Sequence, residues 1–215
     1  IGGAGDLLRN VISSNEGAGV RISGAIASRN VITNNFIGLD SKGTTNVGNT
    51  QEGVALFAPG NIVGPTNIIA GNLRGVLISG AGAVNNQVID NFIGTDLTGK
   101  ADIGNIREGV RIENGASSNL INGNGTGSQL ISGNNVGIAI SSPGTSGNQV
   151  LGSFIGTDVS GTADLGNSLQ GILIESSPGN TIGGTTAAQR NLISANHWGV
   201  EVVNASATRN VIQGN

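Results

Sequence analysis

The sequence predicts an all-β fold in which residues 1–215 form one domain, a three-sided β-solenoid of about seven stacked coils. Three observations predict it. A Gly-apolar-x-apolar tetrapeptide recurs in register, short strand-like pieces lie between its copies, and no sustained helical stripe of apolar residues occurs. With 38 Gly, 4 Phe, 1 Trp and no Tyr, a core built on aromatic residues is excluded.

The tetrapeptide supplies one strand of each coil. Its copies are spaced 34, 22, 34, 28, 34 and 28 residues apart and begin at Gly19, Gly53, Gly75, Gly109, Gly137, Gly171 and Gly199. Long and short units therefore alternate, which gives a higher-order repeat of 56 to 62 residues. The shortest unit, of 22 residues, suits one three-sided coil, and we expect the longer units to add a loop to the same coil.

The two apolar positions of each tetrapeptide are predicted to face inward, where stacking buries them against the next coil. The residue between them is predicted to face outward, and this outer column is Arg21, Ala55, Leu77, Arg111, Ala139, Leu173 and Glu201.

Asparagine marks the turns. A second strand-like piece, Asn-apolar-apolar, begins at Asn30, Asn61, Asn119 and Asn210. Other asparagines recur three residues before the Gly or directly before a Phe. Asn tolerates left-handed backbone and its amide can bond its counterparts in neighbouring coils. We therefore predict structural turn ladders that include Asn72, Asn134, Asn196, Asn35 and Asn91.

One phrase returns in every second coil: NNFIGLD at 34–40, DNFIGTD at 90–96 and GSFIGTD at 152–158. We expect its Phe and Ile to lie in the core, its Gly to form a bend, and its Asp to begin an outward loop.

The loop aspartates Asp40, Asp96 and Asp158 allow two interpretations. A carboxylate with loop carbonyls is the donor set of a calcium site. Asp102 and Asp164 would add a second carboxylate to two of the loops, but the first loop has Asn46 there. The alternative, which we favour, is an Asx turn in which each Asp accepts backbone N–H groups.

The pattern GVxI…NxIxGNxIG resembles the right-handed parallel β-helix repeats of the pectin-lyase-like superfold, often called PbH1 repeats. The phrase FIGTDxxGxxxxGN at 154–167, followed by NTIGG at 180–184 and RNLISAN at 190–196, is similar to a repeat of large bacterial surface and secreted proteins. The resemblance covers nearly the whole chain. It implies a right-handed parallel β-helix and an extracellular or cell-surface location, but that superfold carries both enzymes and passive scaffolds.

Catalytic candidates are few. Glu108 and Glu113 flank one strand, with Arg111 between them, and Asp96 repeats two coils from Asp40. Stacked carboxylates two coils apart would be about 9–10 Å from each other, near the upper end of the spacing that inverting glycosidases use. An exposed ion-pair network explains the same charges more simply. Candidate binding residues are Arg111 and the single His197 beside the single Trp198, which break the repeat.

Charge and composition exclude several partners. A net charge of −3, with no basic stripe, argues against nucleic acid, and no apolar run is long enough to span a membrane. With no Cys there are no disulfides, zinc-thiolate sites or thiol nucleophiles. No cofactor is expected apart from the calcium alternative.

These observations favour a non-catalytic β-helix of a secreted or cell-surface bacterial protein, with polysaccharide or a cell-surface protein as partner. The alternative is a carbohydrate-active enzyme: a polysaccharide lyase, hydrolase or epimerase. Ile1-Gly2-Gly3 repeats Ile182-Gly183-Gly184. The chain is therefore expected to be a fragment of a longer solenoid, able to associate end to end.

Overall fold

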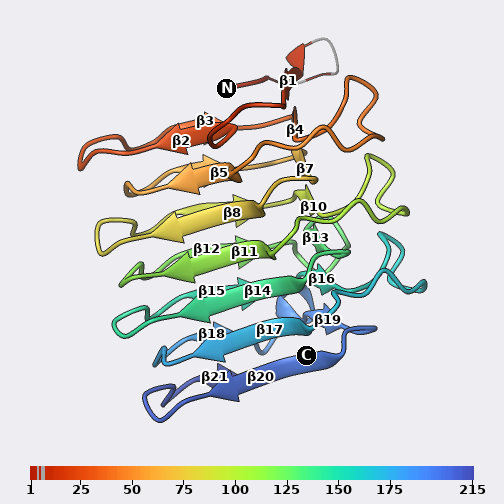
Figure 1. Cartoon of the computed structure of the whole chain (residues 1–215). Coiled ribbons are helices and arrows are strands. Elements are labelled where there is room, and N and C mark those ends of the chain that lie inside the picture. The colour runs from red at the N-terminus through yellow and green to blue at the C-terminus, as the bar shows by residue number, and fades with distance from the viewer. Residues whose placement is uncertain (4, 6–7) are drawn as a thin grey trace.

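The structure is a computed structural model that describes residues 1–3, 5 and 8–215. Three parallel sheets of seven strands each run the length of the molecule. Each coil contributes one strand to every sheet, so the predicted three-sided parallel β-helix of about seven coils is confirmed. The coils stack in sequence order from the N-terminal to the C-terminal end (Figure 1). Within the described residues, no helix is both long and apolar enough to cross a membrane.

The strands are short, and their bounds follow the sequence repeat. Sheet A contains β1 (Asn10–Ile12), β4 (Asn35–Ile37), β7 (Ile68–Ile69), β10 (Phe92–Ile93), β13 (Leu130–Ile131), β16 (Phe154–Ile155) and β19 (Leu192–Ile193). Sheet B contains β2 (Val20–Ile22), β5 (Glu52–Leu56), β8 (Arg74–Ser79), β11 (Glu108–Glu113), β14 (Val136–Ser141), β17 (Gln170–Glu175) and β20 (Trp198–Val203). Sheet C contains β3 (Val31–Ile32), β6 (Ile62–Val63), β9 (Gln87–Ile89), β12 (Leu120–Asn122), β15 (Gln149–Leu151), β18 (Thr181–Ile182) and β21 (Val211–Ile212).

The core lies between the three sheets. In sheet B the first apolar position of each tetrapeptide pairs in register with the same position of the next coil, from Val20 through Val54 and Val76 to Val200. Ile and Val from all three sheets form one continuous buried cluster. Stacking therefore buries side chains that a three-residue strand could not bury alone.

The outer column of sheet B is more shielded than the sequence indicates. Ala55 and Ala139 are 0 % and 1 % exposed, although neither belongs to the core cluster. Ala139 stacks in register between Arg111 and Leu173, whose longer side chains can cover the small one. Leu77 in the same column is also buried, at 7 % exposure, so much of the outer face is shielded from solvent by its neighbours.

Asparagine ladders run along all three corners, which confirms the predicted ladders and extends them. In each ladder a side-chain Nδ2 donates to the side-chain oxygen of the next coil. The corner before sheet B holds Asn15, Asn49, Asn72, Asn105, Asn134, Asn167 and Asn196. The corner before sheet C holds Asn30, Asn61, Asn86, Asn119, Asn148, Asn180 and Asn210.

The third ladder, before sheet A, is interrupted. It starts with Asn10, Asn35, Asn67 and Asn91, and it resumes with Asn191 and Asn215. Gln129 and Ser153 stand between these two runs. Nε2 of Gln129 is buried without a hydrogen-bond partner, and the Ser153 hydroxyl donates to the Leu151 carbonyl of its own coil. This is the weakest point of the corner hydrogen bonding.

The recurring Phe does not lie in the central core, and this corrects the sequence prediction. Ile37, Ile93 and Ile155 are in the core as expected, whereas Phe36 forms a separate cluster with Leu39, Ile68 and Ala70. Successive residues of a strand point to opposite faces, so an inward Ile requires an outward Phe. The loop that follows the phrase then folds back over the Phe ring.

The loops explain why the phrase returns only in every second coil. Three loops project from one side of the stack at regular intervals (Figure 1). The loop glycine Gly99 packs against both Phe92 of its own coil and Leu130 of the next, and Gly161 does the same with Phe154 and Leu192. One loop thus covers two coils, about 10 Å of the stack, and a loop on every coil would leave no room for its neighbour.

Candidate functional site

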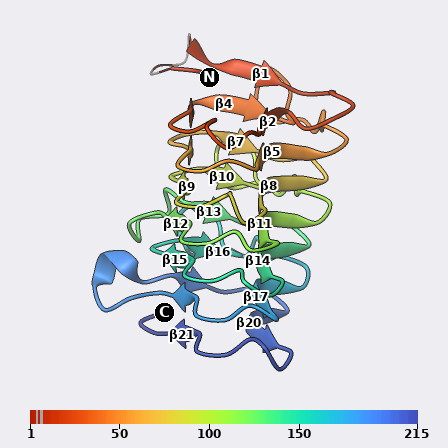
Figure 2. The ribbon, with the colours of Figure 1, turned by 90° about the vertical axis from the view of Figure 1, so that its left-hand side faces the viewer.

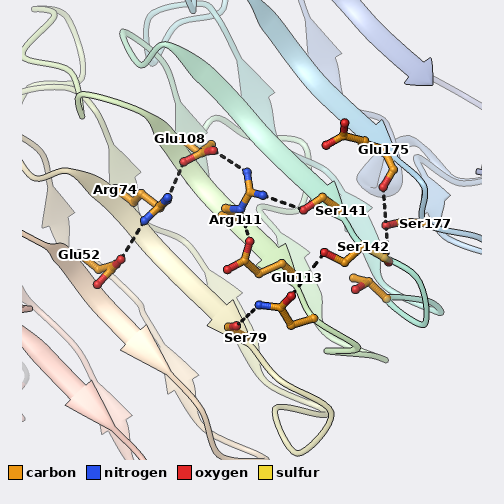
Figure 3. Close-up of polar contacts among 12 residues, drawn as sticks. Glu52, Arg74, Ser79, Glu108, Arg111, Glu113, Ser141, Ser142, Glu175 and Ser177 are labelled. Carbon is orange, nitrogen blue, oxygen red and sulfur yellow. Dashed lines mark hydrogen bonds and ion pairs between the residues drawn. The ribbon is translucent and has the colours of Figure 1, made fainter. Parts of the chain in front are cut away.

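The densest charge cluster lies on the outer face of sheet B, across neighbouring strands. Glu52 on β5 stands opposite Arg74 on β8, and Glu108, Arg111 and Glu113 lie on β11. Figure 3 shows these side chains in one continuous row. The parallel register brings them together, because residues 22 and 34 positions apart in sequence occupy the same height on adjacent strands.

Every charge in this row is paired. Arg74 Nη1 lies 3.0 Å from Glu52 Oε1, and Arg74 Nε lies 2.8 Å from Glu108 Oε2. Arg111 Nη1 lies 2.7 Å from Glu108 Oε1, and its Nε pairs with Glu113. Arg111 Nη2 also donates to the Ser141 hydroxyl on β14 at 2.9 Å. The row therefore joins four consecutive coils.

This pairing disfavours acid–base catalysis, because the carboxylates are already engaged by guanidinium groups. Both oxygens of Glu108 contact guanidinium groups, and its side chain is only 11 % exposed. Arg74 lies between Glu52 and Glu108, in the place where a substrate would have to approach a pair of carboxylates two coils apart. Burial lowers the pKa of Arg111, but the hydrogen bond to Glu113 and the charges of Glu108 and Glu113 outweigh it, so that pKa lies above its ordinary value. The geometry is that of an electrostatic clamp between strands.

The loop aspartates have the hydrogen bonds of Asx turns. Asp40 Oδ1 accepts the N–H groups of Thr44 and Thr45 at 2.9 and 3.1 Å. Asp96 Oδ1 does the same with residues 100 and 101, and Asp158 Oδ1 with residues 162 and 163. These bonds hold the pKa of Asp40 below its usual range, the amide of Thr44 contributing most.

Asp158 shows the same effect with a different leading cause. The hydroxyl of Ser160 lies 2.7 Å from both carboxylate oxygens and lowers the pKa of Asp158. The calcium alternative would need several oxygen ligands at one point. Across the part of the chain that the structure describes, no group of three or more His, Cys, Asp or Glu side chains could hold a metal ion.

Asp102 differs from its counterparts in the other loops. Asn46 Oδ1 and Asp164 Oδ1 each accept the N–H two residues later, at 3.0 and 2.9 Å, whereas Gly104 N–H donates to the Gly94 carbonyl. Burial raises the pKa of Asp102. Asp102 is itself exposed, and among the described residues its carboxylate makes no hydrogen bond to the protein.

The remaining candidates are not brought together. Trp198 is 47 % exposed and stacks edge-on against His197, with ring centroids 4.2 Å apart. Arg111 lies three strands away on sheet B, a separation of about 14 Å at ordinary strand spacing. Asp96 follows a strand of sheet A and bonds residues of its own loop, whereas Glu108 bonds Arg74 and Arg111 on sheet B. The structure therefore brings Glu108, Arg111 and Glu113 together and leaves the other sequence candidates apart from them.

A groove over sheet A is the feature that sequence reasoning missed. Its floor is Phe36, Ile68 and Phe92, three in-register neighbours of β4, β7 and β10. Leu97, Thr66, Asp90, Ser128 and Arg9 complete the lining, and the volume is about 330 Å³. The only signal in the sequence is the regular return of Phe36 and Phe92, for which the phrase predicts a core position.

Comparison with known proteins gives no relative. The chain matches no protein family, no curated protein and no solved structure.

Proposed function

We propose that this chain is a non-catalytic, right-handed parallel β-helix of the pectin-lyase-like type, part of a secreted or cell-surface bacterial protein. It acts as a rigid spacer that carries a face for glycans or for a cell-surface protein. The bacterial surface location rests on the resemblance of the repeat, and the spacer role rests on the hydrogen bonding of the corners.

The observation that carries the proposal is the set of ladders at all three corners. Two of them run without interruption through seven consecutive coils. Bending the stack would open buried amide bonds on the convex side, and each such bond is costly to leave unmade. The ladders therefore support a stiff rod whose length grows with the number of coils.

The state of the candidate carboxylates also favours a non-catalytic role. A general acid or base must exchange its proton with a substrate. Glu108 and Glu113 contact Arg111, while Asp96 accepts backbone amides of its own loop. Each carboxylate has a structural partner that accounts for its position.

The test is incubation of the chain with acidic and neutral polysaccharides, followed by ultraviolet absorbance for lyase products and a reducing-end assay for hydrolysis. We expect no turnover. Turnover that disappears in Glu108→Gln or Asp96→Asn would refute the spacer proposal and favour the carbohydrate-active enzyme.

Self-association is a second property to test. Among the described residues, β1 and β2 at one end of the stack and β19 to β21 at the other each present one edge that no further strand covers. The edge of β3 is partly covered by residue 1, whose ammonium group donates to the Val31 carbonyl at 2.8 Å. Such edges pair readily with other strands. We expect concentration-dependent end-to-end association in light scattering, and a species that stays monomeric at all concentrations would contradict it.

A further inference from the structure

The groove over sheet A has a wall on each of four sides and opens to solvent opposite its floor. Loop residue Leu97 forms one side, and the corner residues Thr66 and Asp90 form the opposite side. Ser128 bounds it toward the C-terminal end and Arg9 toward the N-terminal end, where the guanidinium lies 4.3 Å from the centroid of the Phe36 ring. This frame suits a compact group rather than a polymer that runs through.

The groove is open because the corner segments differ between coils. The chain passes from sheet C to sheet A through two residues before β10, but through residues 123–129 before β13. That longer segment crosses the outer face of sheet A, where Gly127 packs against the Phe154 ring and the Val159 carbonyl. Lower still, the corner carries the 3-10 helix η2 (Ala187–Gln189), which projects from the stack in Figure 2.

The equivalent surface of the next repeat is therefore covered by the chain itself, while the surface over β4, β7 and β10 is not. Leu97 remains 40 % exposed on the wall of the groove. The three Phe-containing phrases are nearly identical, so the difference between the repeats lies in the corners. Over β4, β7 and β10 the corners leave the outer face of sheet A accessible to a ligand.

The lining has two chemical sides. The floor and the loop wall are apolar, and the corner rim carries oxygen atoms from Asp90, Ser128 and Thr66. The Ser128 hydroxyl lies 2.6 Å from Asp90 Oδ1, and within the described chain Asp90 Oδ2 has no hydrogen-bond partner. A volume of about 330 Å³ is at the small end of ligand pockets.

We propose that this groove binds a single neutral sugar ring, such as the end or a branch of a glycan. A pyranose has an apolar C–H face for the Ile68 and Phe92 floor and hydroxyl donors for the carboxylate of Asp90. A neutral sugar fits better than a uronate, because Asp90 would repel a second carboxylate. Arg9 already donates to Asn34 Oδ1 at 2.9 Å and covers Phe36, so it acts here as a wall.

This inference rests on the proposed glycan-contacting function and names its site. The test is saturation-transfer NMR of the 215-residue chain with methyl glucoside, methyl galactoside, N-acetylglucosamine and galacturonate, followed by titration of any sugar that binds. Leu97→Glu places a charge on the apolar wall, and Asp90→Asn removes the rim carboxylate while keeping a residue that tolerates the positive φ of 55°.

Matched controls exist for both variants. Leu169 is 39 % exposed, nearly the same as Leu97, but it lies outside the groove lining. Asp164→Asn recreates in the third loop the Asn46 of the first. We expect at least one neutral sugar to bind, with affinity lowered about tenfold or more in Leu97→Glu and Asp90→Asn, and unchanged in Leu169→Glu and Asp164→Asn.

The proposal would be overturned if no sugar bound, or if galacturonate bound more strongly than the neutral sugars. Equal affinity in Leu97→Glu and Leu169→Glu would also overturn it. A Gly-Leu-Gly tripeptide serves as a further probe, and its binding in place of all four sugars would be the fourth contrary result. Circular dichroism of each variant separates lost binding from lost fold. Absence of sugar binding together with absence of polysaccharide turnover would remove this site and leave the spacer proposal standing.

Discussion

Asn134→Ala tests whether the corner ladders stabilise the rod. Asn134 is fully buried in the middle of the ladder before sheet B. Its Oδ1 accepts the backbone N–H of Asn105 at 3.1 Å and the side-chain Nδ2 of Asn105 at 2.9 Å. Its Nδ2 donates to the carbonyls of residues 93 and 132 and to Asn167 Oδ1, at 3.1, 3.0 and 3.2 Å.

The substitution removes these side-chain bonds and leaves their partners in a buried corner without water. A net contribution of about 1 kcal/mol per hydrogen bond, with a larger cost for partners left unsatisfied, gives a loss of about 3–5 kcal/mol in the free energy of unfolding. That is a large fraction of the stability of an ordinary domain, which is about 5–15 kcal/mol.

The measurement is urea unfolding followed by circular dichroism, with hydrogen exchange to locate the opening. Asn135→Ala is the matched control, since Asn135 is the next residue, exposed, and makes no side-chain hydrogen bond in the described structure. We expect the control to change stability by less than about 0.5 kcal/mol. A loss in Asn134→Ala no larger than that of the control would refute the role of the ladders.

Three further predictions concern single points of the structure. Replacing Gln129 and Ser153 together by Asn restores the interrupted ladder and is expected to stabilise the chain by about 1–3 kcal/mol in the same urea assay; a destabilised double variant would show that the corner cannot hold both amides. Asp102→Asn, which copies Asn46, is expected to raise the melting temperature at pH 7. The raised pKa of Asp102 means that its carboxyl favours folding when protonated and disfavours it as pH rises through the folded-state pKa, so this gain should vanish in acid; an equal gain at pH 2 and pH 7 would contradict the charge argument. Asp158 has the opposite sign: its lowered pKa stabilises the fold above about pH 4, the ordinary value, and this contribution is lost as pH falls through the folded-state pKa. The melting temperature of Asp158→Asn should therefore approach that of the unmodified chain in acid, and a constant difference would count against it.

The fold was predictable because each coil repeats the same local instructions. The Gly-apolar-x-apolar copies became the strands of sheet B, and the Asn-apolar-apolar pieces became strands of sheet C. The ladder residues were recognisable because Asn recurs at fixed sequence offsets from these strands. Glu52, Arg74 and Glu108 were visible only as separate charges, since residues far apart in sequence pair only once the register is known.

The candidate site was less predictable. The apolar character and regular return of Phe36 predict a core position, although its neighbour Ile37 already occupies the inward direction. Neither the loop that covers two coils nor the open groove beside Leu97 follows from one repeat considered alone. Both depend on how the corners of neighbouring coils differ in length.

The sequence by itself thus determined the repeat, the strands, the number of coils and the asparagine corners, because these depend on periods of two residues and of one coil. Only the tertiary structure decided which side of sheet A the Phe residues occupy, which charges neutralise one another on sheet B, and where the surface stays open. These features depend on contacts between coils. The register of the strands and the path of each corner bring together side chains that are far apart in the sequence and that no local pattern connects.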